Sequence, residues 1–169
     1  MSLFLWVAGC SEPPKGYPLF QVTINVGADA PPGERAAVAV LPDGSGSFSR
    51  YRLSELQPVV HADSFVLSHH DMGVLWEAVE RARFFELPEV IEAETNWSHG
   101  PTAWVSVETT TQSHHVLLRH GSSAPLQELI GMTNSLMPEG AVLRYEPLVR
   151  PWWVDWWQRL VAPLAPQAV

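Results

Sequence analysis

The chain has 169 residues, one cysteine and a formal net charge of −8 at pH 7 when its histidines are neutral. This length is typical of one domain, and the negative charge argues against nucleic acid as a partner, because phosphates bind to basic surfaces. The lone cysteine, Cys10, excludes an internal disulfide framework and a zinc site built from cysteines, and no window reaches the ~18 apolar residues that a bilayer span requires.

The first ten residues carry an apolar run, Leu3 to Ala8, that ends in Val7-Ala8-Gly9-Cys10. These four residues resemble the lipobox of bacterial lipoproteins, in which signal peptidase II cuts before a cysteine that receives a diacylglyceryl group. The resemblance implies that Cys10 is the lipidated first residue of the mature chain. The protein would then be held at a membrane of the bacterial cell envelope, facing the periplasm or the exterior.

One feature departs from a secretory signal, because no basic residue precedes this short apolar run. The alternatives are a start codon assigned too late and a chance match, with an apolar N-terminus and a free thiol at Cys10. Residues 11–16 are polar and rich in proline, which is typical of a tether. We therefore divide the chain into a signal remnant and tether (1–19), one domain (20–147) and a C-terminal segment rich in tryptophan (148–169).

Alternation of apolar and polar residues predicts strands in the first part of the domain. The expected strands are Phe20–Val26, Ala36–Leu41, Ser47–Leu53 and a short one at Ser64–Leu67. A turn at Pro42–Gly46 joins two of them, because proline presets φ and glycine accepts positive φ. Pro58 weakens any regular structure over Ser54–Asp63.

An amphipathic helix over Asp71–Phe85 is the clearest element. Ser68 and Asp71 have the spacing of a capping box, and Pro88 stops the helix because it lacks an amide hydrogen. Apolar residues recur at steps of three and four and form one stripe: Met72, Leu75, Val79, Ala82 and Phe85. Such a stripe has to be covered, and a sheet is the natural cover.

Two alternating segments after this helix, Ala103–Thr110 and Ser113–His120, predict an antiparallel hairpin. A weaker strand is expected at Val90–Thr95, and a last edge strand at Ala141–Tyr145. Pro125 begins a second helix, whose apolar stripe is Leu126, Leu129, Ile130, Thr133 and Leu136. The predicted fold class is α+β, an antiparallel sheet with two amphipathic helices packed on one face and a short helix near the C-terminus.

Two short motifs in the domain, Phe84-Phe85-Glu86-Leu87-Pro88 and Pro125-Leu126-Gln127-Glu128-Leu129, accompany this order of hairpins and helices. The combination resembles a class of small uncharacterised bacterial envelope proteins and spans about three-quarters of the chain. The resemblance implies a fold but no activity, since the matching residues are core and capping positions.

The C-terminal segment holds half of the tryptophans, at Trp152, Trp153, Trp156 and Trp157. At helical spacing these rings share one face, which has to dock on something. The segment either covers its own domain or contacts a partner or a membrane, because indole suits binding sites and the membrane–water boundary. In the second case the two ends of the chain could share one membrane surface.

Four histidines, His69, His70, His114 and His120, are candidates for a metal site, and the last two could share a face of a strand. A zinc site needs three or four converging ligands, which nothing in the spacing indicates. The sequence has no Gly-x-Ser-x-Gly elbow or phosphate loop, and we expect no cofactor. The prediction is a lipid-anchored envelope protein that has a non-enzymatic binding or structural role, with an envelope protein as its candidate partner. The alternative is a periplasmic metal-binding protein or hydrolase that uses these histidines.

Overall fold

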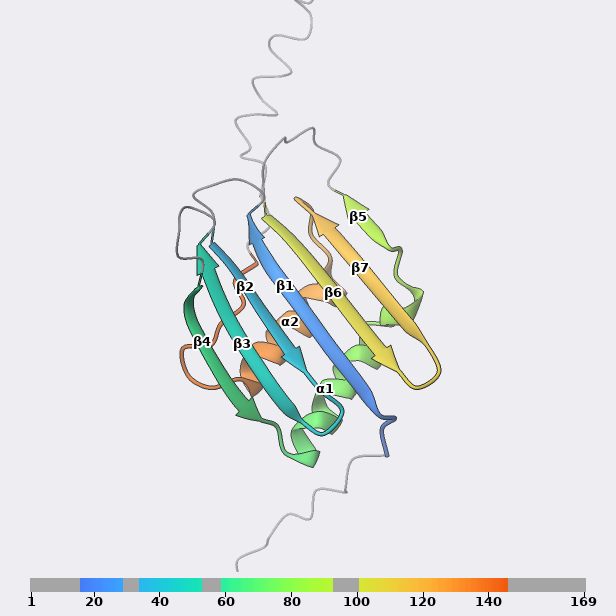
Figure 1. Cartoon of the computed structure of the whole chain (residues 1–169). Helices are drawn as coiled ribbons and strands as arrows, with labels where there is room; N and C mark the ends of the chain where they lie inside the picture. Colours follow the sequence, from blue (N-terminus) through green and yellow to red (C-terminus); the bar gives the residue numbers. More distant parts are fainter. Residues whose placement is uncertain (1–15, 29–33, 53–58, 93–100, 146–169) are drawn as a thin grey trace, which may run out of the picture.

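The structure, a computed structural model, describes residues 16–28, 34–52, 59–92 and 101–145 (Figure 1). Its strands are β1 (Phe20–Ala28), β2 (Glu34–Val40), β3 (Ser45–Arg52), β4 (Val59–Val66), β5 (Val90–Glu92), β6 (Pro101–Thr109) and β7 (Ser113–Arg119). Its helices are α1 (His69–Arg81), the short 3-10 helix η1 (Phe84–Glu86) and α2 (Ala124–Leu136). The α+β class is thereby confirmed. None of the described helices is long and apolar enough to cross a membrane.

All seven strands belong to one open sheet with the order β4-β3-β2-β1-β6-β7-β5. Every neighbouring pair is antiparallel except β5 and β7, which run parallel. Figure 1 shows β1 in the middle of the sheet. Strands β2, β3 and β4 lie on one side of it, and the β6–β7 hairpin lies on the other. The predicted hairpin is therefore confirmed, and β1 joins it to the N-terminal strands.

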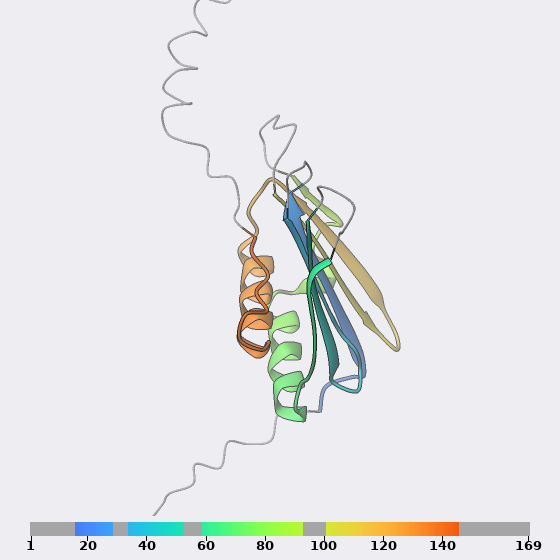
Figure 2. The ribbon, with the colours of Figure 1, turned by 60° about the vertical axis from the view of Figure 1, so that its left-hand side comes forward.

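The two helices lie on the same side of this sheet (Figure 2). Alternate residues of β1, namely Phe20, Val22, Ile24 and Val26, are buried on that side. The expected stripes of both helices supply the other half of the core, with Leu75 of α1 and Leu126 and Leu129 of α2 fully buried. The opposite face of the sheet carries no described helix, and we call it the open face (Figure 2).

The first helix begins as predicted and ends earlier. The Ser68 hydroxyl accepts a hydrogen bond from the backbone amide of Asp71 at 3.2 Å. The Asp71 carboxylate accepts one from the backbone amide of Ser68 at 3.1 Å, and the two bonds confirm the capping box. The helix ends at Arg81, and Arg83 turns the chain with φ of 47°. Phe85 therefore lies in η1 and not in α1, which corrects the expected helix end.

Two strand predictions were wrong. Strand β4 begins at Val59 rather than at Ser64. Pro58 does not prevent this, because it comes before the first residue that pairs with β3 and therefore removes no hydrogen bond between the two strands. The segment Ala141–Tyr145 is not a strand. The Asn134 side chain binds both backbone groups of Leu143, accepting its amide at 2.8 Å and donating to its carbonyl at 2.9 Å, so they are not left for a neighbouring strand.

Three predictions reach beyond the described residues. Strand β5 is described as Val90–Glu92, and the rest of the expected Val90–Thr95 lies outside. Cys10 and the part of the tether before Gly16 lie outside as well. So does the C-terminal helix expected around Trp152, Trp153, Trp156 and Trp157.

Candidate functional site

The open face is built from the residues that alternate with the core positions of each strand. Along β1, β2 and β3 these residues are mostly small or polar: Gln21, Thr23, Asn25, Ala37, Ala39, Ser47 and Ser49. This part of the face offers hydroxyl and amide groups and few bulky side chains.

One row across the open face differs from this pattern. Gly27 at the end of β1 lies opposite Arg35 of β2 and Thr102 of β6. Arg35 in turn faces Tyr51 of β3, and Thr102 faces Arg119 of β7. Directly opposed residues on neighbouring strands point to the same side of a sheet. The row therefore places two arginines and a tyrosine around a position that has no side chain.

A hollow of about 570 Å³ opens over this row, and we call it the open-face hollow. Asn25, Trp104 and Leu117 line it together with the row. Gly27 gives the hollow its floor, since a Cβ atom there would lie 2.5 Å from Cγ of Arg35. The stem of Arg35 therefore crosses the glycine, and any larger residue would displace it.

The two arginines of the hollow differ in their partners. Arg119 Nη1 lies 3.3 Å from Glu92 Oε1, and both side chains of this pair are exposed. The side chain of Arg35 has no hydrogen bond or ion pair with any of the described residues. Exposed ion pairs contribute only about 0–1 kcal/mol, so the Glu92 carboxylate competes weakly for Arg119. Both guanidinium groups can therefore accept an anion from solution, and a guanidinium suits bidentate contact with a carboxylate.

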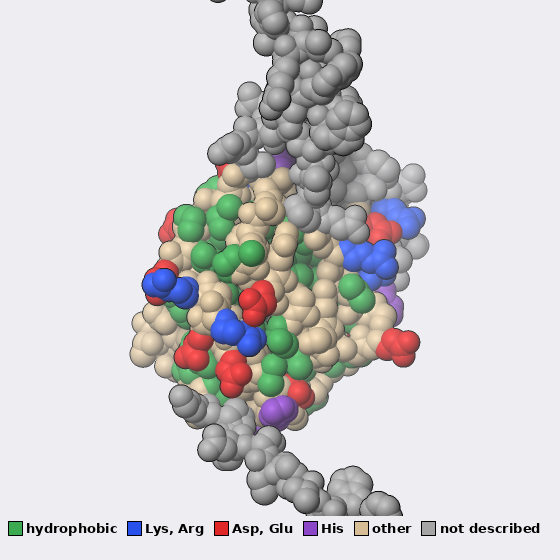
Figure 3. Space-filling view, turned by 180° about the vertical axis from the view of Figure 1, so that it is seen from behind, with side chains coloured by type: hydrophobic (Ala, Val, Ile, Leu, Met, Phe, Trp, Pro, Cys, Tyr) green, Lys and Arg blue, Asp and Glu red, His purple; other side chains and the backbone are tan. Residues whose placement is uncertain are grey.

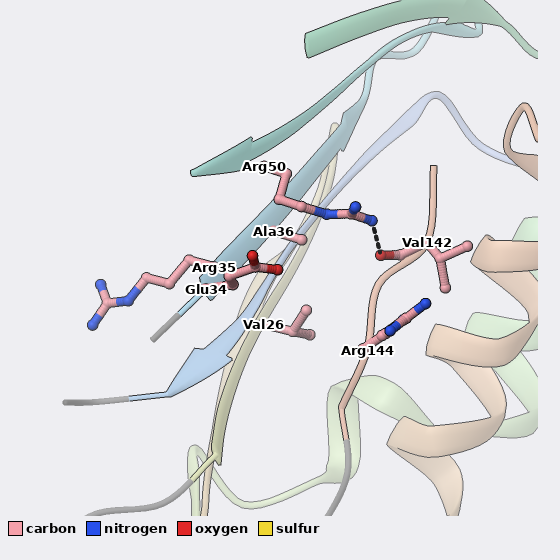
Figure 4. A pocket seen from close by; sticks show the side chains of 7 residues that line it. All are labelled: Val26, Glu34, Arg35, Ala36, Arg50, Val142 and Arg144. Atoms are coloured by element: carbon pink, nitrogen blue, oxygen red, sulfur yellow. Dashed lines mark hydrogen bonds between the residues drawn. The ribbon is translucent and has the colours of Figure 1, made fainter. Parts of the chain in front are cut away.

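A smaller pocket of about 100 Å³ lies at the same end of the sheet, on the helix side. Figure 4 shows Arg50 reaching from β3 toward the carbonyl of Val142, to which its Nη2 donates at 3.5 Å. Arg144 also lines this pocket, whereas the side chain of Arg35 points away from it. Arginines therefore occupy both faces at this end.

The basic residues of the described chain are unevenly placed. Seven are described, and five of them belong to this end of the sheet: Arg35, Arg50, Arg52, Arg119 and Arg144. Seen from the helix side, a group of basic side chains lies at the upper right edge of the molecule, and others lie at the left edge and near the centre (Figure 3). Within the described part of the chain, most of the positive charge thus lies at one end of the sheet.

The ends of the described chain are far apart. Near the N-terminus, the Tyr17 hydroxyl lies 2.6 Å from Nδ1 of His69, where α1 begins. At the other end of the sheet, the Tyr145 hydroxyl donates to the Gly121 carbonyl at 2.7 Å, just after β7. Burial raises the pKa of Tyr145 to about 12. The described chain thus begins at the end of the sheet opposite to the open-face hollow (Figure 1).

The structure does not bring the candidate histidines together. His69 and His70 begin α1, where His69 faces Tyr17. His114 lies on the helix side of β7, with its Nε2 2.9 Å from the Leu87 carbonyl oxygen. His120 follows the other end of that strand, ~20 Å away at ~3.3 Å per residue. Across residues 16–28, 34–52, 59–92 and 101–145, no three histidine, cysteine or carboxylate side chains could hold a metal ion.

The sequence alone did not predict the residues of the open-face hollow. The alternation along Ala103–Thr110 places Trp104 off the core face, but an exposed tryptophan is a weak signal on its own. Arg35 lies just before the expected strand Ala36–Leu41, whereas β2 begins at Glu34, so the face to which Arg35 points could not be predicted. The row depends on the register of five strands, which is set by long-range pairing and is not visible in any one segment.

Comparison of the chain with known protein families and with curated proteins finds no match. The open-face hollow is therefore interpreted from its own geometry.

Proposed function

We propose that the protein is a lipid-anchored component of the bacterial cell envelope that acts by binding, without catalysis, and that the open-face hollow is its binding site. The observation that carries the proposal is Arg35, whose guanidinium has no partner among the described residues and which lines the same hollow as Arg119 and Trp104. A positive group that the fold itself does not neutralise is available for a negatively charged ligand.

The chemistry of the lining favours binding over catalysis. Among the described residues that line the hollow, the reactive groups are guanidinium, hydroxyl, amide and aromatic groups. Proton transfer and nucleophilic attack in enzymes usually use histidine, carboxylate or thiol groups, and this lining contains none of them. The hollow is suited to holding an anion in place.

The position of the hollow agrees with an anchor at Cys10. Strand β1 starts at Phe20, next to the N-terminal segment, and ends at Ala28 beside the hollow. Nine residues of strand span ~30 Å. A lipid on Cys10 would attach the domain by the start of β1, so the hollow would open at the end that is farther from the membrane.

The tryptophan-rich segment is part of the proposal as a contact for a partner or a membrane, through Trp152, Trp153, Trp156 and Trp157. It follows Tyr145, which lies at the hollow end of the sheet. A single membrane surface shared with Cys10 would require the segment to return along the length of the domain. A contact with an envelope partner at the hollow end requires no such return, and we favour it.

The anchor is tested by the intact mass of the protein recovered from the membrane fraction of its native host. The proposal expects a mature chain that begins at Cys10 and carries the added mass of acyl groups. A Cys10→Ala variant should move to the soluble fraction. An unmodified chain that retains Met1, found in the soluble fraction, would contradict the proposal and leave Cys10 an ordinary thiol.

A further inference from the structure

We infer that the ligand of the open-face hollow is an acidic saccharide, a short chain of sugar rings that carry carboxylates. The inference rests on the proposed binding function and names the class of ligand for the same site. It is drawn from the spacing of the two arginines, the rings beside them and the polar surface that continues from the hollow.

The arginines indicate more than one negative charge. Arg35 belongs to β2 and Arg119 to β7, and β1 and β6 lie between them. Three strand spacings of ~4.8 Å place their Cα atoms ~14 Å apart. A single small oxyanion would engage one guanidinium fully, whereas a chain with an acid group on successive rings can reach both.

The aromatic side chains indicate rings. Trp104 is 36% exposed, although it stands in the middle of a strand between Asn25 of β1 and Leu117 of β7. An aromatic ring offers a rigid apolar surface, against which the carbon-bound hydrogens of a sugar ring can pack. Asn25 and Tyr51 bring polar groups to the same hollow, and these groups can hydrogen-bond with ring hydroxyls.

The size and surroundings of the hollow fit a short chain. Its volume of about 570 Å³ lies in the ~300–1,000 Å³ range of small-molecule sites. An inorganic oxyanion would leave most of it empty. The open face continues beyond the hollow with Thr23, Ser47 and Ser49, whose hydroxyls suit a ligand rich in hydroxyl groups.

The net charge of the protein distinguishes this ligand from a nucleic acid. A chain with a formal charge of −8 repels a polymer that carries one phosphate for each nucleotide on every strand. A short saccharide with a few carboxylates meets the arginines of the hollow at a much lower total charge. The same repulsion makes binding sensitive to the length of the acidic chain.

The test is calorimetric titration of the full chain as the Cys10→Ala variant with trigalacturonate. Maltotriose serves as the neutral ligand of equal length, and inorganic phosphate serves as the simple oxyanion. We expect trigalacturonate to bind, and to bind at least ten times more tightly than either of the other two. Binding should weaken as salt is added, because the contacts are charged and exposed.

The variants assign the binding to the hollow. Arg35→Gln and Trp104→Ala should each weaken trigalacturonate at least tenfold, and Arg35→Gln combined with Arg119→Gln should abolish binding. Arg81→Gln is the matched control, since Arg81 is an exposed arginine of α1 that pairs with Glu128 at 3.1 Å, on the helix side. It should leave the affinity unchanged. Circular dichroism of each variant checks that the fold is retained.

Four results would overturn the inference. The first is an absence of trigalacturonate binding, and the second is equal affinity for trigalacturonate and maltotriose. The third is an equal loss of affinity from Arg81→Gln and Arg35→Gln. The fourth is phosphate binding that is as tight as trigalacturonate binding and does not respond to Trp104→Ala. None of these results touches the lipid on Cys10, which the membrane fraction tests independently, so failure of the ligand class and failure of the anchor can be told apart.

Discussion

The two faces of the seven-stranded sheet are made from alternate residues of the same strands, yet they differ in almost every property. On the helix side of β1, Ile24 is completely buried under α1 and α2. One residue away, Thr23 faces the open side among other small polar groups. The helix side holds the molecule together, and the open side is where the structure leaves charge and aromatic surface available.

This difference has an energetic meaning. A buried aliphatic side chain stabilises a fold by about 1.5–3 kcal/mol, whereas most surface substitutions change stability by about 0.5 kcal/mol or less. A residue on the open face can therefore change with little effect on folding. The exception is a position where backbone and side chain meet closely, as Gly27 and Arg35 do.

The largest effect is expected from the core. Ile24→Ala should lower the free energy of unfolding by about 2–5 kcal/mol, because it opens a cavity in the middle of the sheet. The neighbouring substitution Thr23→Ala should change it by about 0.5 kcal/mol or less. Urea unfolding of the two variants measures both values. Similar losses of unfolding free energy from both substitutions would show that the open face is covered, and the two faces would then not differ as described.

The next effect concerns Gly27. A Cβ atom at this position would lie 2.5 Å from Cγ of Arg35 and 2.8 Å from the carbonyl oxygen of Glu34, and the carbonyl cannot rotate away. Gly27→Ala should therefore destabilise the protein by about 1–3 kcal/mol and weaken the saccharide by moving Arg35.

Gly131 provides the control for that substitution. It lies in α2, and an added Cβ atom would have no neighbour within 4 Å. Gly131→Ala should stabilise the protein by about 0.5–1 kcal/mol, because alanine favours helix over glycine. A stabilised Gly27→Ala variant with unchanged ligand affinity would show that the glycine does not position Arg35.

The capping box at the start of α1 is expected to contribute about 1 kcal/mol, so Ser68→Ala should lower the thermal midpoint measurably. The hydrogen bond from the Ser68 side chain lowers the pKa of Asp71 below its usual range. A lowered carboxyl pKa stabilises the fold above the ordinary pKa of about 3.9, and this contribution disappears as the pH falls through the lowered value. The difference between wild type and Ser68→Ala should therefore shrink in acid. If the difference in stability between wild type and Ser68→Ala stays constant down to pH 2, the Asp71 carboxylate contributes nothing to it. The stabilisation would then come only from the Ser68 hydroxyl.

An effect of similar size is expected at Tyr145, whose hydroxyl bonds the last described segment to Gly121. Tyr145→Phe removes one hydrogen bond and should cost about 0.5–1.5 kcal/mol. Burial raises the pKa of Tyr145 to about 12, so its contribution is complete below the ordinary pKa of about 10 and is lost as the pH rises toward 12. Stability measured across this alkaline range should fall more in wild type than in Tyr145→Phe. Parallel curves would mean that the hydroxyl is solvated.

Local patterns predicted much of the helix side. The capping box at Ser68, the apolar stripe of α1 and the alternation along β1 and β6 were all visible within a few consecutive residues. These features follow from backbone geometry and from the need to bury one face. The wrong strand at Ala141–Tyr145 shows the limit, since the Asn134 side chain binds backbone groups that a ladder would have used.

The candidate site could not be predicted in the same way. Arg35, Gly27 and Arg119 are far apart in the chain and become neighbours only through the registers of β2, β1, β6 and β7. A shift of one residue in any of these pairings would send a side chain to the other face. The histidines, which attract attention in the sequence, are kept apart by the same geometry.

The central pairing of β1 with β6 also has a consequence for how the chain folds. The other antiparallel pairs join strands that follow one another, so their hairpins can form on a timescale of about 1–10 μs. The β1–β6 ladder instead joins distant residues, as the bond between Gln21 and Glu108 does across 87 positions. Closing so long a loop is slow, and it has to precede the burial of Val22 against Val107. Until the β1–β6 ladder forms, β1 is an unpaired edge of the N-terminal strands and β6 is an unpaired edge of the β6–β7 hairpin. Aggregation during refolding should therefore begin at β1 and β6.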